Sequence, residues 1–407
     1  MAGRLWLVPA AMALLLPSSC WGETSAPPPT TSRTASVSAS TRSSEHPPAK
    51  KLLCLYSLPC PGLHARPSAL LPPSALDSSL CTHIVISSAL LHNTTIVPCS
   101  PGDTEVYKKV VALKKKNPSL QVMVRVEGNW TALTRDRLAV AVFAYNAQQF
   151  LQKMGLGGLE LSWQPPALPP WGKSTAHQLS LLLLQLNNAI KLASHPPLLF
   201  SMVVSASQKV IDSVYDMKVL NQTVDFVSVA TYDFHIYESY LPFTGHGAPL
   251  QAREAEKGYW ATLNTRWAAK YWLSKGLPRE KLVVTIPSFA NTWTLLSSGW
   301  NKVGAPAVGL GIMQGHMTYP KVCGFLQGSG QRWDKASRVP YAWRSREWVS
   351  YENEASVKEK AELVIAEHIG GVSLLDLNSD DWAGQCPGAT TFPLLRAVKE
   401  VLSRPGV

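Results

Sequence analysis

The segment GGLELSWQ, residues 157–164, carries the residue types that could do chemistry. Apolar and polar residues alternate strictly, so the segment is predicted to be a β-strand whose Glu160, Ser162 and Gln164 side chains share one face. Three polar side chains that point into one interior are costly unless they line a site or pair with each other. A general acid must release a proton near neutral pH, and the Gln164 amide cannot. The pattern therefore predicts a site that lacks its proton donor.

The elements around this strand alternate between strand-like and helix-like segments from residue 51 onward. Strands are predicted at residues 51–56, 83–89, 120–126, 157–163, 198–204, 224–232, 281–289 and 371–377. Helices are predicted at residues 104–116, 131–154, 175–194, 209–221, 254–275, 356–368 and 392–402. Eight strands with helices between them indicate an α/β fold, a (β/α)8 TIM barrel, rather than an open doubly wound sheet. No glycine-rich phosphate loop follows any strand, which argues against a nucleotide-binding fold.

Two connections depart from this pattern. The one after the first strand has no long predicted helix, because prolines between residues 59 and 73 interrupt it. About 80 residues separate the seventh strand from the eighth, and turn residues and aromatics fill most of them. We expect a small α+β subdomain there, at about residues 292–354. Because the C-terminal ends of barrel strands carry the site, this insertion would form one wall of a cleft.

The N-terminus has the pattern of a signal peptide over residues 1–22. Arg4 is followed by an apolar run from Leu5 to Leu16 and by a plausible cleavage site at residues 20–22. The run is too short to span a bilayer, and no other run approaches that length; a signal anchor is the alternative. Residues 23–50 are Ser, Thr or Pro at 17 of 28 positions, which predicts a disordered and O-glycosylated stalk. The folded domain is then expected at residues 51–407, in a secreted protein.

Cysteines and sequons agree with secretion. Six cysteines remain after the signal peptide, and an even number in an oxidising compartment predicts disulfides. N-glycosylation sequons begin at Asn93, Asn129 and Asn221. Asn129 lies just past the third predicted strand, so a glycan there would cover or fill the cleft. The alternative is that Asn129 is unmodified.

The net charge of +11 is partly concentrated on one predicted helix, in Lys108, Lys109 and Lys114 to Lys116. These lysines either form a solvated helix face or contact sulfated glycans or an acidic membrane surface. A nucleic-acid partner is not expected, because no binding motif is present. The ten histidines show no metal-ligand spacing, and no Ser or Cys nucleophile motif occurs. We expect no metal, no cofactor and a monomer.

Five further segments complete the pattern: LCTHI (80–84), TYDFH (231–235), TGHGAPL (244–250), VGAP (303–306) and DDW (380–382). Over nearly all of residues 51–403 the chain resembles the secreted chitinases and chitinase-like lectins of glycoside hydrolase family 18. The resemblance implies a (β/α)8 barrel with an α+β insertion and a cleft for β-1,4-linked N-acetylglucosamine chains. It also implies the disulfides Cys54–Cys81 and Cys323–Cys386. Cys60 and Cys99 remain, and both follow neighbouring strands, so we predict that they pair.

Active members of the family carry Asp-Gly-x-Asp-x-Asp-x-Glu on the fourth strand, and the four acids align with Gly157, Glu160, Ser162 and Gln164. In the family mechanism the Glu protonates the leaving oxygen, while the Asp before it orients the acetamido group that attacks. Neither Gln164 nor Ser162 can take these roles. Glu160 is interpreted as a buried structural carboxylate, with a substitute catalytic role for it or for Asp233 as the alternative.

The binding positions that the resemblance implies are partly kept. Tyr56, Tyr232 and Asp233 match cleft positions. Leu375 stands where the family has the tryptophan that floors its central subsite, Asn291 replaces an arginine, and Asn129 replaces a tryptophan, although Trp130 follows it. Each lost stacking face costs about 1 kcal/mol. Trp163 is predicted to face outward and pack under helices.

Two functions are therefore predicted. The first is a catalytically inactive chitinase-like protein that binds N-acetylglucosamine-type or other glycans in a remodelled cleft. The second is an interaction or signalling protein that binds a protein receptor or a sulfated glycan through its surface, with an idle cleft. A residual hydrolase is the third hypothesis.

Overall fold

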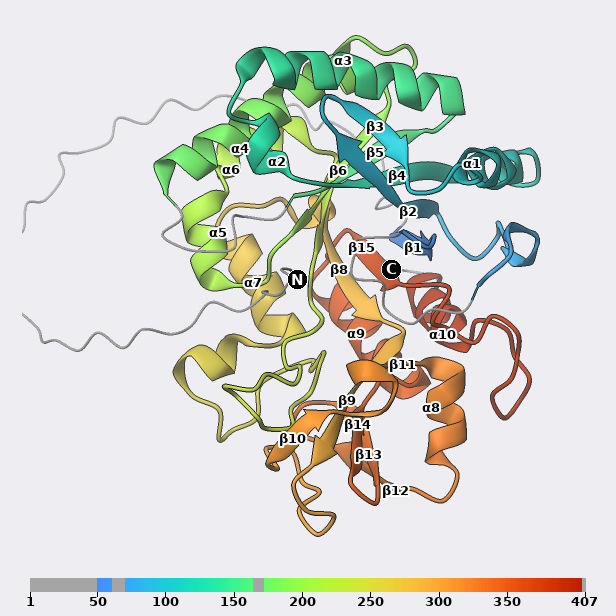
Figure 1. The fold of residues 1–407 in the computed structure, drawn as a ribbon, viewed down its shortest axis with the longest axis vertical. Coiled ribbons are helices and arrows are strands. Elements are labelled where there is room, and N and C mark those ends of the chain that lie inside the picture. Colours follow the sequence, from blue (N-terminus) through green and yellow to red (C-terminus); the bar gives the residue numbers. More distant parts are fainter. Residues whose placement is uncertain (1–49, 61–69, 164–171, 405–407) are drawn as a thin grey trace, which may run out of the picture.

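The computed structural model describes residues 50–60, 70–163 and 172–404. Eight parallel strands in these ranges form a closed ring (Figure 1). In order round the ring they are β1 (Lys51–Ser57), β2 (His83–His92), β4 (Gln121–Glu127), β5 (Gly158–Ser162), β6 (Leu199–Val204), β7 (Phe226–Val229), β8 (Leu282–Pro287) and β15 (Gly371–Leu375). β1 pairs with both β2 and β15, which closes the ring. The predicted (β/α)8 barrel is confirmed.

Side chains alternate between the barrel interior and the surrounding helix layer, as a pleated strand requires. In β1, Leu53 and Leu55 belong to a small buried cluster inside the barrel. Leu52, Cys54 and Tyr56 belong to the larger cluster between the strands and the helices. The same alternation in the other strands decides which polar residues reach the interior.

Helices cover the outside of the ring. They are α1 (Asp103–Val111), α2 (Trp130–Leu133), α3 (Arg137–Met154), α4 (Lys173–Leu186), α5 (Gln208–Val214), α6 (Met217–Thr223), α7 (Thr265–Ser274), α9 (Glu354–Ala366) and α10 (Pro393–Leu402). The 3-10 turn η2 (Ala112–Lys115) extends α1, and the π-helical segment η3 (Asn187–Leu192) extends α4. The last helix is strongly amphipathic and buries Leu394, Leu395 and Val398.

Three predicted helices are divided in the structure, and capping side chains mark the divisions. The segment 131–154 forms α2 and α3, with Asp136 accepting a hydrogen bond from the Leu138 amide at the start of α3. Asp216 caps α6 and separates it from α5. The segment 254–275 begins with the 3-10 helix η4 (Gly258–Thr262), and Asn264 caps α7.

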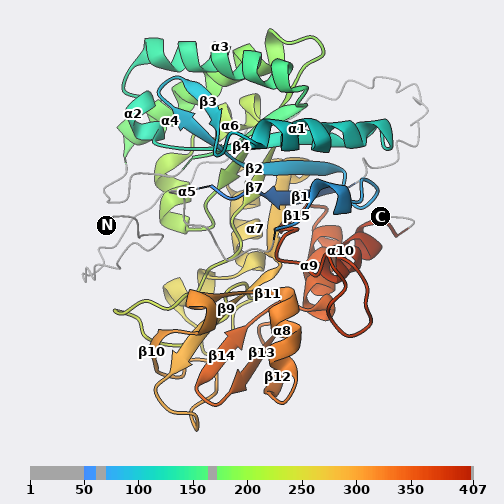
Figure 2. The same cartoon turned by 45° about the vertical axis from the view of Figure 1, so that its right-hand side comes forward.

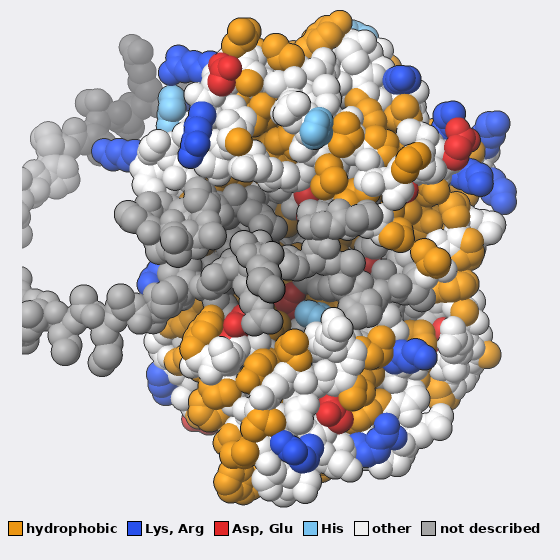
Figure 3. All heavy atoms as spheres, in the orientation of Figure 1, with side chains coloured by type: hydrophobic (Ala, Val, Ile, Leu, Met, Phe, Trp, Pro, Cys, Tyr) orange, Lys and Arg blue, Asp and Glu red, His pale blue; other side chains and the backbone are white. Residues whose placement is uncertain are grey.

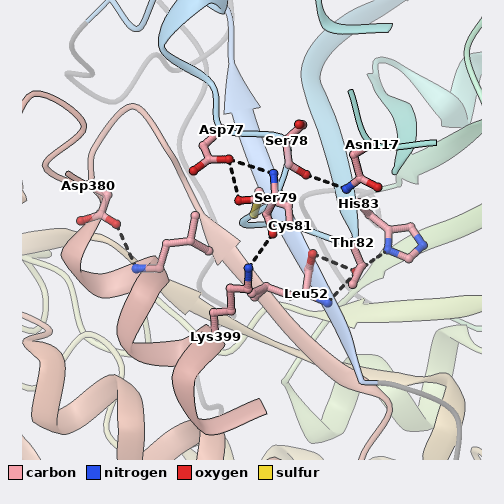
Figure 4. The surroundings of a disulfide bond; sticks show 12 residues. Leu52, Asp77, Ser78, Ser79, Cys81, Thr82, His83, Asn117, Asp380 and Lys399 are labelled. Atoms are coloured by element: carbon pink, nitrogen blue, oxygen red, sulfur yellow. Dashed lines mark hydrogen bonds between the residues drawn. A yellow bond between two sulfur atoms is a disulfide. The ribbon is translucent and has the colours of Figure 1, made fainter. Parts of the chain in front are cut away.

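The connection from β1 to β2 has only the short 3-10 helix η1 (Pro73–Ala75) in its described part. The Cys54–Cys81 disulfide and hydrogen bonds from neighbouring elements hold the C-terminal end of this connection in place (Figure 4). The Lys399 ammonium donates to the Ser79 carbonyl at 2.6 Å, and the Asn117 amide donates to the Ser78 carbonyl at 2.8 Å. A disulfide and hydrogen bonds thus anchor the described part of this connection to the barrel and its helices.

An antiparallel sheet is inserted between β8 and α9, where the sequence predicts an α+β subdomain. Its strands are β9 (Phe289–Leu295), β10 (Ala307–Leu310), β11 (His316–Thr318), β12 (Gly330–Asp334), β13 (Val339–Arg344) and β14 (Glu347–Ser350), with helix α8 (Tyr319–Leu326). Figures 1 and 2 both show this sheet below the barrel. β9 begins directly after β8, so the sheet starts slightly earlier in the chain than expected.

The sequence did not predict β3 (Thr95–Pro98), which forms a hairpin with the extended end of β2. The Cys60–Cys99 disulfide links this hairpin to the segment after β1. The third disulfide, Cys323–Cys386, joins α8 to the loop before α10. All three pairings match the sequence-based expectation.

Candidate functional site

The polar row of β5 begins with Glu160, which is fully buried inside the barrel. Two nitrogens of Arg125, on the adjacent strand β4, lie 2.7 and 2.6 Å from one Glu160 carboxylate oxygen. The Ser228 hydroxyl of β7 donates to the other oxygen at 2.9 Å. Both carboxylate oxygens are therefore occupied by barrel residues.

This arrangement fixes the charges inside the barrel. Burial, the largest single influence, lowers the pKa of the Arg125 guanidinium, but Glu160, Tyr232 and Glu127 together outweigh burial and the pKa is raised. Glu160 accordingly faces a permanent cation and lies below the barrel mouth. This geometry is consistent with Glu160 as a structural carboxylate and disfavours it as a substitute acid.

The other positions of the altered acid motif differ in how far the structure defines them. Gly157 lies just before β5, and a Cβ there would lie 3.1 Å from the Gln121 side chain. Ser162 is half-buried at the end of β5, opposite Glu127 on β4. Gln164 lies outside the described residues, so its role rests on the sequence alone.

A second group of predicted residues meets at the ends of β7, β8 and β15. Asp233 follows β7 and adopts a left-handed conformation, with φ of 53°. The Asn291 amide donates to its carboxylate at 2.9 Å, and His316 Nε2 lies 3.9 Å from the same oxygen. The Tyr232 ring packs edge-to-face on Phe289 at 6.4 Å. Leu375 lies in the same buried cluster as Phe289.

Carboxylate, amide and imidazole groups thus stand beside an aromatic and aliphatic floor. Such a combination can hydrogen-bond the hydroxyl and acetamido groups of a sugar, and the partly buried Tyr232 ring can contact its apolar face, whereas Phe289 and Leu375 are buried beneath it. The described residues of this group offer acceptors and donors for binding. They supply no carboxylic acid at the aligned donor position.

Two predicted binding residues are not in this group. Tyr56 was expected to line the cleft, but it points into the helix layer and its hydroxyl donates to the Leu71 carbonyl at 2.7 Å. Leu55 takes the inward position, because neighbouring residues of a strand face opposite sides. Trp130 is 1% exposed. Its indole donates to the Ser162 carbonyl at 2.7 Å and its ring packs edge-to-face on Phe143, so it supports the end of β5 from outside.

Trp163 behaves as predicted. It is buried in the cluster between strands and helices.

Three residues near the site were not among those predicted from the sequence. Arg125 could have been recognised, because an arginine at an inward position of an apolar strand requires a buried partner. Phe289 and His316 could not, because their positions depend on how β9 and β11 pair in the inserted sheet. His316 is placed opposite Asn291 by that pairing.

A Ser-His-Asp arrangement lies next to this group, because Ser350 on β14 pairs with Asn291 on β9. His246 Nδ1 is 3.4 Å from the Ser350 hydroxyl, and its Nε2 is 3.0 Å from the Asp334 carboxylate. However, Ser350 and His246 are 4% and 2% exposed, and the Ser350 hydroxyl accepts the Gly247 amide. A substrate cannot reach so deeply buried a hydroxyl. The arrangement instead ties the loop after β7 to the inserted sheet.

The three sequons differ in their surroundings. Asn93 is exposed in the turn between β2 and β3. Asn129 is exposed, and its side-chain oxygen accepts from the Ala132 amide at the start of α2. Asn221 is half-buried in α6, and its amide nitrogen donates to the Gly276 carbonyl at 2.9 Å.

The lysines of α1 and η2 lie on the surface. Lys108, Lys109, Lys115 and Lys116 are exposed and Lys114 is partly exposed. Lys108 forms an ion pair with Glu105 at 2.7 Å. The other lysines make a cationic strip along this helix and turn.

Membrane-spanning helices and metal-binding clusters are both absent from the described residues. No helix there has the length and apolar character needed to cross a membrane. In the same parts of the chain, no three His, Cys, Asp or Glu side chains gather in a way that could hold a metal ion.

Comparison with known proteins adds to this geometry. The model of the family described as glycosyl hydrolases family 18 matches residues 64–380. The chain is 32% identical over 373 residues to the oviduct-specific glycoprotein of Ovis aries, covering 87% of this chain and 67% of that protein. It is 30% identical over 350 residues to chitotriosidase-1 of Mus musculus, covering 82% and 74%. It is 28% identical over 346 residues to chitinase-3-like protein 2 of Homo sapiens, covering 81% and 87%.

Solved structures of chitinases and a pseudo-chitinase are also similar to this chain. Human YKL-39, described as a pseudo-chitinase with retained chitooligosaccharide binding properties, superposes with a TM-score of 0.80 at 28% identity, covering 88% of this chain and 100% of that one. Ostrinia furnacalis Group IV chitinase in complex with allosamidin gives a TM-score of 0.78 at 29% identity, covering 87% and 99%. The chain is thus similar to both enzymes and a pseudo-chitinase, and the chemistry of its own site must distinguish them.

Proposed function

The chain belongs to glycosyl hydrolases family 18, and we propose that it is a secreted, catalytically inactive member that binds N-acetylglucosamine-type glycans at the barrel mouth. The main observation is the altered acid motif on an intact scaffold. Gln164 and Ser162 occupy the two positions whose acids perform the family reaction. Relatives include a pseudo-chitinase that retains chitooligosaccharide binding, which supports binding without hydrolysis.

The buried charges support the loss of catalysis. Glu160 is the only acid left in the aligned motif, and Arg125 and Ser228 occupy its carboxylate. A proton donor contributes about 100- to 10,000-fold to such a reaction. With that donor absent and Glu160 paired, hydrolysis by the family route has no residue to begin it.

Binding is supported by the residues around Asp233. Asn291 and His316 lie at its carboxylate, and the partly buried Tyr232 ring offers apolar contact area above the buried Phe289 and Leu375 side chains. Leu375 in place of the family tryptophan removes one stacking face, so we expect weaker binding than in members that keep it. Secretion is supported by the signal-like N-terminus and the three disulfides.

Isothermal titration with N-acetylglucosamine oligomers, from the dimer to the hexamer, tests this function. We expect measurable binding of the longer oligomers and at least about a tenfold loss in Asp233→Ala, because that carboxylate anchors the polar group of the site. Asp212→Ala is the matched control, since Asp212 lies on α5 and pairs with Lys275 at 2.6 Å. A wild-type protein that binds no oligomer up to the hexamer contradicts the proposal.

A second candidate function rests on the lysines of α1 and η2. An interaction protein with an idle cleft would use this cationic strip to bind a sulfated glycan or an acidic protein surface. Elution from a heparin column at rising salt tests it. Reversal of Lys109, Lys115 and Lys116 to Glu should abolish retention, whereas reversal of Lys209, Lys218 and Lys257 serves as a control with the same change in net charge. Equal retention of the two variants would exclude this surface.

A further inference from the structure

Exposed apolar side chains are unevenly distributed over the molecule. Of the sixteen large hydrophobic residues that the described chain exposes, ten lie between residues 240 and 313, on the connection from β7 to α7 and on the first strands of the insertion. Figure 3 shows hydrophobic side chains gathered over the lower part of one face, around β10. Concentrations of this kind mark binding surfaces more often than scattered apolar residues do.

One part of this surface consists of aromatic rings with fixed orientations. Trp260, on η4, is 42% exposed, and the neighbouring Tyr259 is 40% exposed. The His235 ring stacks on Trp260, with ring centres 6.2 Å apart and planes inclined by 18°. Tyr259 packs against the edge of the same indole at 5.8 Å and 67°. Two neighbours therefore hold Trp260 while much of it stays accessible.

The stacked pair is continuous with the barrel mouth. His235 lies two residues beyond Asp233 in the loop that follows β7, and its Nδ1 is 3.0 Å from the His246 carbonyl. A Cβ on Gly245 would lie 2.5 Å from the His235 ring, so the backbone at Gly245 supports the ring from one side. The loop after β7 thus carries both Asp233 and, two residues on, the ring that packs against the Trp260 indole.

We propose that Trp260 and Tyr259 form an outer subsite on which a sugar ring of a longer N-acetylglucosamine chain stacks, outside the position anchored by Asp233. This inference rests on the proposed glycan-binding function and extends it. Sugar rings have an apolar face that fits a flat aromatic surface. A preformed indole loses little conformational freedom when it is covered.

The chemistry of these residues favours a sugar over a protein partner. The accessible surface at this point is aromatic and rigidly supported, whereas the aliphatic residues of the patch, such as Leu310 and Met313, lie on the inserted sheet and its adjoining turn. A chain bound at Asp233 would need such a second contact for its distal residues. The subsite would then make affinity depend on oligomer length.

Titration of Trp260→Ala with oligomers of increasing length tests the inference. We expect about a 3- to 10-fold loss of affinity for the hexamer and an unchanged affinity for the shortest oligomer that the wild type binds. Trp260→Phe should retain most of the hexamer affinity, because it keeps a ring. Tyr145→Ala is the matched control, since Tyr145 is an exposed aromatic residue, 60% accessible, on α3. Thermal unfolding of each variant verifies folding.

The outcomes of these titrations distinguish a failure of the outer subsite from a failure of the proposed glycan-binding function. If Trp260→Ala binds the hexamer as the wild type does while Asp233→Ala loses binding, the outer subsite is wrong and the proposed function stands. Equal losses for the short and the long oligomers would also overturn the subsite, because they would place Trp260 at the Asp233 position. A wild type that binds no oligomer would overturn both. If Trp260→Ala does not fold, the Tyr259→Ala titration decides by the same length criterion.

Discussion

Arg125 and Glu160 form an ion pair inside the barrel, between adjacent strands and below the mouth. The Glu160 side chain has no accessible surface, and the Arg125 side chain is 8% accessible. Two nitrogens of the guanidinium contact one carboxylate oxygen, and Ser228 satisfies the other. The strand that carries catalytic acids in active relatives therefore carries a neutralised charge in this chain.

Removing one partner of this pair should destabilise the fold strongly. Arg125→Met leaves a buried carboxylate uncompensated, and breaking such a pair costs about 3–5 kcal/mol. The double variant Arg125→Met with Glu160→Leu should recover most of this loss, because apolar pairs of similar volume often replace buried ion pairs at little cost. Urea unfolding measures the free energy of each variant. Equal stability of the single and double variants would contradict the assigned pairing.

Restoring the missing acids tests whether their loss explains inactivity. We expect no turnover of a fluorogenic chitotriose by the wild type. Ser162→Asp with Gln164→Glu should raise turnover at least about 100-fold above the detection limit set by the wild type, because a general acid contributes on that order. Ser162→Asn with Gln164→Asn keeps both side chains polar but non-acidic and is the control. Hydrolysis by the wild type that disappears in Asp233→Ala would instead show a substitute acid.

Two buried histidines should make the protein less stable at acidic pH. Burial, with the Lys51 charge adding to it, lowers the pKa of His83 to about 4. Burial lowers the pKa of His235 to about 4 as well, against its hydrogen bond with the His246 carbonyl. The unfolded chain therefore binds more protons between pH 4 and 6.5. The stability that the neutral imidazoles provide is complete above pH 6.5 and is lost as the pH falls towards 4.

The pKa shift of Asp380 has the opposite effect on the pH dependence of stability. Burial raises the pKa of its carboxyl to about 7, although the Leu394 and Leu395 amides of α10 donate to it. The folded state thus binds the extra proton between pH 4 and 7, and stability falls as the pH rises through this window. Two histidines outweigh one aspartate, so we expect urea stability to rise by at least about 1 kcal/mol from pH 4.5 to 6.5 and to change little from pH 6.5 to 7. In Asp380→Asn the rise from pH 4.5 to 6.5 should be larger, because the opposing contribution of the carboxyl is absent.

The barrel could be predicted from sequence because each of its strands is a short buried run between turn signals. It was harder to assign which face of a strand a side chain occupies than to locate the strands and helices themselves. Tyr56 was placed in the cleft by alignment, but the pleat of β1 directs Leu55 inward, and a shift of one residue exchanges the two faces of a strand. Trp130 was placed in the cleft for its type, yet the start of α2 at Asn129 turns it beneath the helix.

Which residues meet at the barrel mouth depends on strand pairing and loop packing between distant segments, and the local sequence does not encode these contacts. His316 reaches Asp233 only because β11 pairs with β9. The stack of His235 on Trp260 joins residues 25 positions apart through an irregular loop. In contrast, Asp233 and Asn291 were predicted individually, and the structure adds the hydrogen bond that joins them.

N-glycan occupancy should differ between sequons. Asn93 is exposed in a hairpin turn, at a φ of 53° that asparagine tolerates. In contrast, the Asn221 amide nitrogen is used in a hydrogen bond, and the Thr223 hydroxyl donates to the Val219 carbonyl inside α6. We expect high occupancy at Asn93 and low occupancy at Asn221 in protein secreted from mammalian cells. Glycopeptide mass spectrometry after enzymatic deglycosylation in heavy-oxygen water measures both; higher occupancy at Asn221 would contradict this ranking.

The Cys60–Cys99 disulfide should stabilise the hairpin of β2 and β3 more than the barrel. It closes a loop across a separation of 39 residues, for which the loss of a disulfide costs about 2–4 kcal/mol. Part of that cost should appear locally, because β3 lies at the edge of the sheet and pairs there with β2 alone, while the Asn146 amide donates to the Thr94 carbonyl at 2.8 Å. In Cys60→Ser with Cys99→Ser, hydrogen exchange should therefore accelerate in β3 and the end of β2 while β5 and β6 stay protected. Peptide mapping without reduction verifies the pairing in the parent protein, and uniform acceleration through the barrel would show that the bridge supports the whole fold instead.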